Sequence, residues 1–162
     1  MTILAIDPGP IESALVWFDG TNVLRMEILP NESVLGELVA TDADHLAIER
    51  VESFGMAVGV EVFETVFYTG RFCEAFAGNF TRINRREIKL HLCGSSRAKD
   101  TNVRQALIDR FGPGKDAAVG TKRQPGPLYG IRSHLWSGLA VAVTWWDLYW
   151  LACGQTVSEC DR

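Results

Sequence analysis

The chain has 162 residues, of which 47% are hydrophobic and 22% are charged, a profile that is typical of a folded globular protein and excludes a disordered one. Its formal net charge of −4 gives no direct sign of a nucleic-acid partner, but the charge is unevenly distributed. Residues 1–81 contain 3 Lys/Arg and 13 Asp/Glu, whereas residues 82–132 contain 12 Lys/Arg and 4 Asp/Glu. This division is typical of an enzyme whose carboxylates bind cations while a separate basic surface meets phosphates, although an ordinary solvated surface explains it equally well.

Neither secretion nor membrane insertion is predicted. The N-terminus lacks the pattern of a secretory signal, and the four cysteines show no metal-binding spacing, so we expect reduced thiols and a cytoplasmic location. The apolar stretch 135–153 is long enough for a membrane span, but Asp147 lies within it and no positive cluster flanks it. We therefore interpret it as a buried helix and expect no membrane partner.

The first half of the chain predicts a meander of strands followed by helices. Apolar runs at 2–6, 13–18 and 23–29 indicate three antiparallel strands, the last two joined by a turn at Asp19-Gly20. A short helix capped by Asn31 or Ser33 should follow, and residues 45–49 indicate a buried strand. A long amphipathic helix over 59–77 is predicted by apolar residues at three- and four-residue spacing, which are Val60, Phe63, Phe67, Phe72 and Phe76.

The second half alternates a strand with helices and loops. We expect a brief strand at 80–83, then helices over 84–92, 101–111 and 133–151, with polar loops over 94–99 and 117–130. Because the chain has no internal repeat or linker, it predicts one domain over 1–152 and a frayed tail over 153–162. The whole pattern predicts an α/β fold, in which a mixed central sheet of a meander and then parallel strands is flanked by helices.

Two carboxylates stand where predicted strands end. Asp7 ends the first strand and precedes Gly9, which permits close approach to the backbone, and Glu49 ends the apolar run that begins at Leu46. Facing one another at a sheet edge, they would repel unless a cation lay between them, and hard oxygen ligands suit Mg²⁺ or Mn²⁺. We expect two such ions, because a pair can activate water and stabilise the leaving oxygen of a phosphodiester. For Asp7 alone, a turn-forming role is the simpler interpretation.

These motifs, in this order, resemble the RuvC family of Holliday junction resolvases, and more narrowly the small RuvC-like proteins of phages and prophages. The likeness extends nearly to Trp146 and rests on Ile-Leu-Ala-Ile-Asp7-Pro-Gly9 and the stretches 48–72, 96–110 and 120–143. It implies an RNase H-like fold, metal-assisted hydrolysis of branched DNA, a homodimer and no small-molecule cofactor. The location would be the host cytoplasm if a phage encodes the protein.

The sequence departs from the family pattern at the start of the last helix. RuvC proteins resemble one another in carrying two metal-site residues three apart there, and these positions are His134 and Ser137 in this chain. Imidazole is a competent ligand for Mn²⁺ or can move the proton of an attacking water, whereas Ser is a poor ligand. The resemblance thus implies a metal and catalytic site of Asp7, Glu49 and His134, with capping or packing as the alternative role for His134.

The basic segment, residues 82–132, supplies the expected DNA-binding surface, which surrounds two helix starts and a Pro/Gly-rich loop. We expect it to recognise the shape of the DNA rather than its bases. Its residues are Arg82, Arg85, Arg86, Lys89, Arg97, Lys99, Arg104, Lys122 and Arg123. By family likeness, Phe54 lies where relatives carry an aromatic wedge that stacks in an opened junction, and a core position is the alternative.

Three functions stay open from the sequence. The leading one is a metal-dependent endonuclease that cuts branched DNA, either a Holliday junction or a flap. Ser137 favours a second, a catalytically weak or inactive junction-binding module of the same fold. The third is a nucleotide-binding fold of the sugar-kinase and actin type, which also begins with a strand, an Asp and a Gly turn. Such folds need two domains of this kind, and we expect no room for them in 162 residues.

Overall fold

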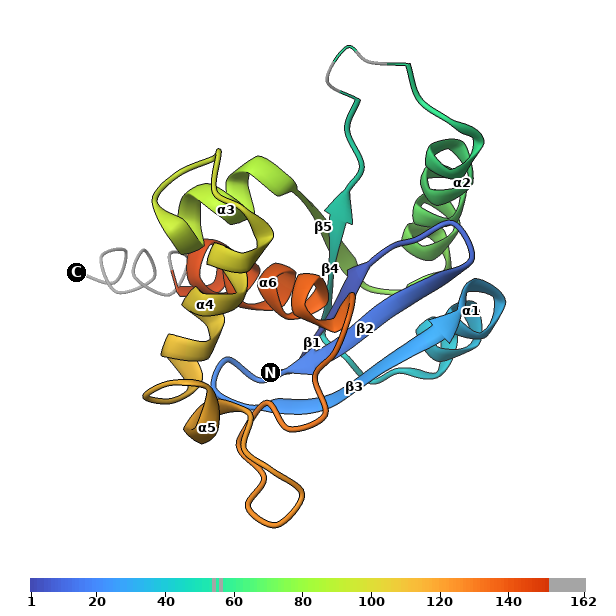
Figure 1. The fold of residues 1–162 in the computed structure, drawn as a ribbon. Helices are drawn as coiled ribbons and strands as arrows, with labels where there is room; N and C mark the ends of the chain where they lie inside the picture. The colour runs from blue at the N-terminus through green and yellow to red at the C-terminus, as the bar shows by residue number, and fades with distance from the viewer. Residues whose placement is uncertain (54, 56, 152–162) are drawn as a thin grey trace, which may run out of the picture.

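The structure, a computed structural model, describes residues 1–53, 55 and 57–151, and its centre is a five-stranded mixed sheet (Figure 1). The strands run in the order β3-β2-β1-β4-β5, and their bounds are β1 (Ile3–Asp7), β2 (Glu12–Phe18), β3 (Val23–Pro30), β4 (His45–Arg50) and β5 (Asn79–Asn84). The first three strands form an antiparallel meander, and β4 and β5 are parallel to β1. The predicted α/β class is confirmed.

Helices cover both faces of this sheet (Figure 1). One face carries α1 (Asn31–Ala40) and α2 (Val60–Ala75). The other carries α3 (Arg85–Cys93), α4 (Asp100–Phe111), the short α5 (Lys115–Ala118) and α6 (Leu135–Trp145), which continues into the π-helix η1 (Trp146–Trp150). Within the described residues, none of the helices combines the length and the apolar character that a bilayer crossing needs.

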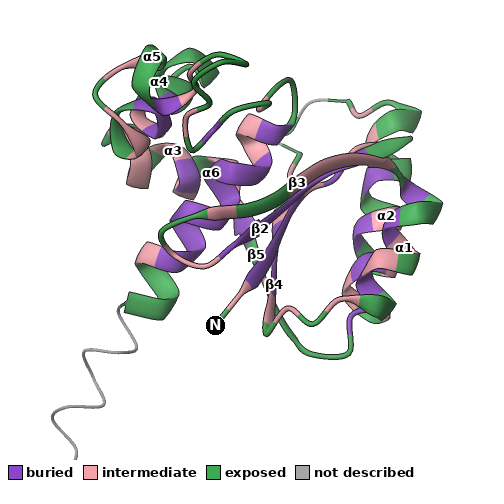
Figure 2. Ribbon diagram, turned by 90° about the horizontal axis from the view of Figure 1, so that it is seen from below, coloured by how far each residue is buried: buried purple, intermediate pink, exposed green. Residues whose placement is uncertain are grey.

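Burial follows the two-residue period of the central strands, because side chains alternate between the faces of a sheet. Along β1, Ile3 and Ala5 pack toward α6, whereas Leu4 and Ile6 pack toward α1 and α2. All four side chains are fully buried, and buried positions run through the middle layer in Figure 2. The same alternation directs the last residue of β1, Asp7, to the α6 side.

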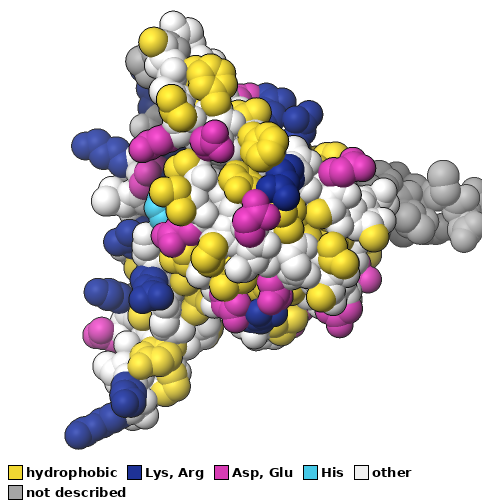
Figure 3. Space-filling model, turned by 90° about the vertical axis from the view of Figure 1, so that its right-hand side faces the viewer, with side chains coloured by type: hydrophobic (Ala, Val, Ile, Leu, Met, Phe, Trp, Pro, Cys, Tyr) yellow, Lys and Arg dark blue, Asp and Glu magenta, His cyan; other side chains and the backbone are white. Residues whose placement is uncertain are grey.

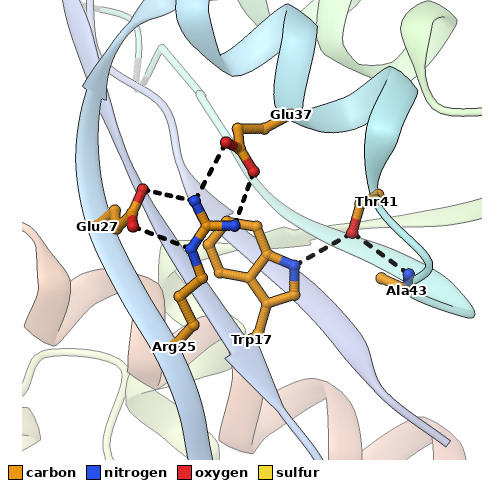
Figure 4. Close-up of polar contacts among 6 residues, drawn as sticks. All are labelled: Trp17, Arg25, Glu27, Glu37, Thr41 and Ala43. Atoms are coloured by element: carbon orange, nitrogen blue, oxygen red, sulfur yellow. Dashed lines mark hydrogen bonds and ion pairs between the residues drawn. The ribbon is translucent and has the colours of Figure 1, made fainter.

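A polar cluster joins the outer strand of the meander to α1 (Figure 4). The Arg25 guanidinium pairs with Glu27 and Glu37 and lies 4.4 Å from the centroid of the Trp17 ring. The Trp17 indole N–H donates a hydrogen bond to the Thr41 hydroxyl at 3.1 Å. Each partly exposed ion pair contributes little to stability. The stacking of Arg25 on Trp17 and the Trp17–Thr41 hydrogen bond therefore matter more for the arrangement of this cluster. Trp17 pairs with Leu4, whereas Asp7 pairs with Ala14, so this cluster lies toward the opposite end of β1 from Asp7.

Several local predictions differ from the structure. Asn31 is the first residue of α1 rather than its cap, because its side chain is buried against the β1–β2 turn. The last helix begins at Leu135 and changes to a π-helix after Trp145. Phe63 and Phe67 of the predicted amphipathic helix are exposed, so much of its apolar stripe does not face this chain's core. Cys73 and Cys93 are half-buried free thiols, in line with the expectation of reduced cysteines.

Candidate active site

The ends of β1 and β4 bring Asp7 and Glu49 together. These strands are parallel neighbours in which Ile6 pairs with Ile48, so the next residue on each strand is a carboxylate. The alternation that directs Ala5 and Ala47 toward α6 directs both carboxylates to that same side. Their side chains are only 16% and 15% exposed. The structure therefore places the two predicted metal ligands side by side at one edge of the sheet.

Both carboxylates are harder to ionise than usual, mainly because they are buried. Burial raises the pKa of Glu49 to about 7, and the negative charge of Asp7 adds to this effect, while Arg85 opposes it. Burial also raises the pKa of Asp7, against the lowering effects of His134, Arg85 and Ser137. A cation bound to both oxygen groups would stabilise both charges. The pair therefore fits one hard divalent ion, such as Mg²⁺ or Mn²⁺.

His134 approaches Asp7 from the start of α6. Its Nδ1 lies 3.4 Å from Asp7 Oδ2, and its side chain is 67% exposed. The residue is the N-cap of α6, but its side chain makes no capping hydrogen bond, so the structure shows no side-chain capping role. Ser137, less than one helical turn later, makes a hydrogen bond with Asp7 that lowers the pKa of this carboxyl. Gly138 permits this approach, because a Cβ there would lie 3.1 Å from a methyl group of Val16.

A third carboxylate, Asp100, borders the site and was missed by the sequence analysis. Its Oδ1 lies 2.9 Å from Arg85 Nη2 and 3.2 Å from Lys89 Nζ. The other terminal nitrogen of Arg85 lies 3.2 Å from Glu49 Oε2. Asp100 is the first residue of α4, where an acidic side chain is common because it stabilises the helix dipole, so its type alone carried no functional signal. Arg85 and Lys89, both predicted to bind DNA, are thus paired with carboxylates.

The arrangement supports fewer metal ligands than the sequence suggested. Among the residues that the structure describes, no three His, Cys, Asp or Glu side chains form a group that could hold a metal ion. Asp7 and Glu49 are the two carboxylates that could provide oxygen ligands for one ion, and the His134 imidazole lies beside Asp7. Asp100 is separated from Glu49 by the guanidinium that contacts them both.

A hydrogen-bond network holds the turn after Asp7, and sequence reasoning missed this network too. The buried Asn31 amide donates to the Gly9 carbonyl at 2.9 Å and accepts from the Ser13 hydroxyl at 2.7 Å. The Gly9 N–H in turn donates to Ser13 Oγ at 3.2 Å. Gly9 does permit a close approach to its backbone, but the group that approaches is the Glu12 carbonyl oxygen, which would lie 2.4 Å from a Cβ at position 9. This turn and His134 line a hollow of about 510 Å³ beside the site.

The other basic residues predicted to bind DNA are all exposed. They are Arg82, Arg86, Arg97, Lys99, Arg104, Lys122 and Arg123. Figure 3 shows Lys and Arg side chains spread along one side of the molecule with a histidine between them. Arg104 lies over the Trp136 ring at 5.2 Å, and the loop that carries Lys122 projects from the body (Figure 1). Arg82 differs, because it lines a groove of about 390 Å³ beside α2, on the other face of the sheet. Phe54 lies outside the described residues.

Comparison with known proteins gives matches among solved structures. No family model matches the sequence, and a search of curated proteins also found no match. RuvC from Thermus thermophilus aligns over 95% of this chain and 97% of its own, with a TM-score of 0.63 and 19% identity. T. thermophilus RuvC in complex with a Holliday junction substrate aligns over 95% and 96%, with a TM-score of 0.65 and 17% identity. A ROK hexokinase from T. thermophilus aligns over 62% of this chain and 40% of its own, with a TM-score of 0.40 and 14% identity. The chain has the RuvC-like, RNase H-like α/β fold that its motifs predict.

Proposed function

We propose that the chain is an endonuclease of the RuvC type that uses a divalent metal ion to hydrolyse phosphodiester bonds in branched DNA, a Holliday junction or a flap. The observation that carries this proposal is the pair of buried carboxylates, Asp7 and Glu49, at the ends of neighbouring parallel strands with His134 beside them. The fold adds support, because a RuvC of the same fold is known in complex with a Holliday junction substrate. The order of the motifs favours the phage and prophage type within this group.

The proposed roles follow from the placement of each side chain. Asp7 and Glu49 hold Mg²⁺ or Mn²⁺ through hard oxygen atoms. When bound, the ion supplies Lewis-acid polarisation and neutralises negative charge at the phosphodiester. The His134 imidazole, open to solvent and 3.4 Å from Asp7, can in its neutral form accept a proton from the attacking water. The exposed Lys and Arg side chains bind phosphates, which positions the DNA without reading its bases.

The enzyme in this proposal is a homodimer, because a junction offers two equivalent strands. An apolar stripe on α2 supports it: the side chains of Val60, Phe63, Val66 and Phe67 are 76%, 64%, 50% and 57% exposed. Val60, Phe63 and Phe67 follow the i, i+3, i+7 spacing of one helix face. Clustered apolar side chains on a surface are typical of a protein–protein contact, and a second copy is the partner that we propose.

Cleavage of labelled synthetic four-way junctions, flaps and plain duplex, with Mg²⁺ or Mn²⁺, tests the proposal directly. We expect cuts near the branch point and none in plain duplex. Asp7→Asn and Glu49→Gln should reduce cleavage to the level without protein and still bind the junction, because neither change alters the basic surface. Asp116→Asn, at an exposed position on α5, is the matched control and should cleave like the parent. Near-normal cleavage by either site variant would reject the proposed centre.

A junction-binding module without nuclease activity is the second candidate. Ser137 favours this candidate, because the start of α6 then carries no carboxylate. The contact of Arg85 with Glu49 favours it as well. The same assay separates the two functions. Salt-sensitive binding to junctions in preference to duplex, without cleavage in either metal, would establish the binding module.

A further inference from the structure

Asp7, Glu49 and Asp100 form a cluster that we call the acidic centre. The Arg85 guanidinium lies between two of its carboxylates, Glu49 and Asp100. Its Nη1 lies 3.2 Å from Glu49 Oε2, and its Nη2 lies 2.9 Å from Asp100 Oδ1. A guanidinium is planar and always charged, and its nitrogen atoms keep a fixed separation. It can therefore join two carboxylates as a divalent ion would, through charge and directed contacts on both sides.

Arg85 is a partly buried member of this centre, and its partner Asp100 is 71% exposed. It is the first residue of α3, whose start is held by Asn84, because the Asn84 side chain accepts a hydrogen bond from the Glu87 N–H at 2.8 Å. The Arg85 side chain is 25% exposed, whereas the next residue, Arg86, is exposed to solvent. Lys89, one turn further along α3, lies 3.2 Å from the same Asp100 oxygen that contacts Arg85. Asp100 thus anchors the guanidinium.

The charges of the centre leave a place for one divalent ion rather than two. Ionised Asp7, Glu49 and Asp100 carry three negative charges, and the cations in contact with them, Arg85 and Lys89, carry two positive charges. One divalent ion would change the net charge from −1 to +1, and a second would bring it to +3. The start of α6 adds no carboxylate to balance such an excess, because its first turn contains no acidic residue.

We propose that Arg85 takes the place of a second metal ion, with Asp100 as its anchor, so that the centre binds one divalent cation at Asp7 and Glu49. This inference rests on the proposed function, because it concerns the metal of the same site. It replaces the two ions that the sequence predicted with one ion and one side-chain cation.

Counting Mn²⁺ ions bound to the DNA-free protein, by calorimetry and by electron paramagnetic resonance, tests this inference without an activity measurement. We expect one ion per chain in the parent and two in Arg85→Gln, which removes the charge while keeping a polar side chain of similar reach. Arg85→Lys keeps the charge and should bind one ion. The double variant Arg85→Gln/Asp100→Asn should return to one ion, because the second ion would need the Asp100 carboxylate. Arg86→Gln is the matched control on the same helix and should bind one ion.

Two ions per chain in the parent would overturn the inference, and so would a single ion in Arg85→Gln. If Arg85→Gln does not fold, the counts for the parent and Arg85→Lys still decide, because two ions in either protein overturn the inference. A parent that cuts junctions with two ions rejects only this inference. A parent that binds one ion and cuts no DNA rejects only the nuclease function. Binding of no ion by any of these proteins would reject both.

Discussion

Replacement of Glu49 by Gln is expected to stabilise the metal-free protein while it abolishes cleavage. The Glu49 side chain is 15% exposed, and burial together with the charge of Asp7 raises its pKa to about 7 from an ordinary value of 4.5. Because the folded-state pKa lies above that of the unfolded chain, folding favours the protonated carboxyl. The resulting stabilisation is complete below about pH 4.5 and is lost as the pH rises through 7. At pH 8 the folded protein must therefore hold an unfavourable negative charge.

The size of this effect follows from the shift in pKa. Each pKa unit corresponds to about 1.4 kcal/mol, so ionised Glu49 destabilises the metal-free fold by roughly 3 kcal/mol at pH 8 and by less than about 1 kcal/mol at pH 5. A Gln side chain is neutral at both pH values, and its carbonyl oxygen can still accept the hydrogen bond from Arg85. The variant should thus gain roughly 6–12 °C in melting temperature at pH 8, since 1 kcal/mol shifts a domain of this size by roughly 2–4 °C.

Urea unfolding followed by circular dichroism, in EDTA at pH 5 and pH 8, measures this difference in the free energy of unfolding. Glu12→Gln, which neutralises an exposed carboxylate at the start of β2, is the matched control and should change stability by less than about 0.5 kcal/mol. Added Mn²⁺ should stabilise the parent at pH 8 but not Glu49→Gln, because the ion binds the ionised carboxylate. Equal stability of parent and variant at pH 8 in EDTA would refute the reasoning about burial and charge.

Ser137→Asp adds a carboxylate beside the acidic centre, so the Mn²⁺ affinity measured by calorimetry should rise by roughly tenfold; an unchanged affinity would place the ion out of reach of position 137. Joint replacement by Ala of three exposed basic residues, Arg97, Lys99 and Arg104, should weaken junction binding and reduce the slope of log affinity against log salt by roughly 2–3, because each lost phosphate contact contributes about 0.9. An unchanged slope would locate the DNA elsewhere. Phe63→Asp, on the exposed stripe of α2, should sediment as a folded monomer, and persistence of a dimer would move the interface off this helix.

The sheet and its carboxylates were predictable because their signals are local. Each strand is an apolar run that stops at a turn or a charge, and the two-residue period of burial fixes which side chains share a face. Asp7 and Glu49 were visible as charges at the ends of buried strands. The predicted helix over 84–92 is confirmed as α3, and the Asn84 side chain caps it by accepting a hydrogen bond from the Glu87 N–H.

The rest depends on contacts between distant segments, which the sequence does not reveal. The sequence shows that residues 82–132 are basic, but nothing local shows that Arg85 contacts Glu49, 36 positions earlier. The alternation along β5 directs Arg82 to the α2 face of the sheet, whereas α3, which carries Arg86, packs on the other face. Asn31 was read as a cap because its type suits one, yet its partner Gly9 lies 22 positions earlier. In each case the residue type suggested a role, but the sequence did not reveal which distant residue the side chain contacts.

The serine at position 137 and the pairing of Arg85 are physically connected. Arg85, Asp100 and Ser137 line one hollow of about 250 Å³, so a carboxylate at position 137 would offer the guanidinium a third acceptor. With a neutral Ser there, the Arg85 guanidinium contacts Glu49 and Asp100. The Ser137 hydroxyl instead bonds Asp7 and helps to keep that carboxyl ionised. In the proposed centre, Ser137 would thus weaken a second metal position and support the one at Asp7 and Glu49, as one ion and one guanidinium require.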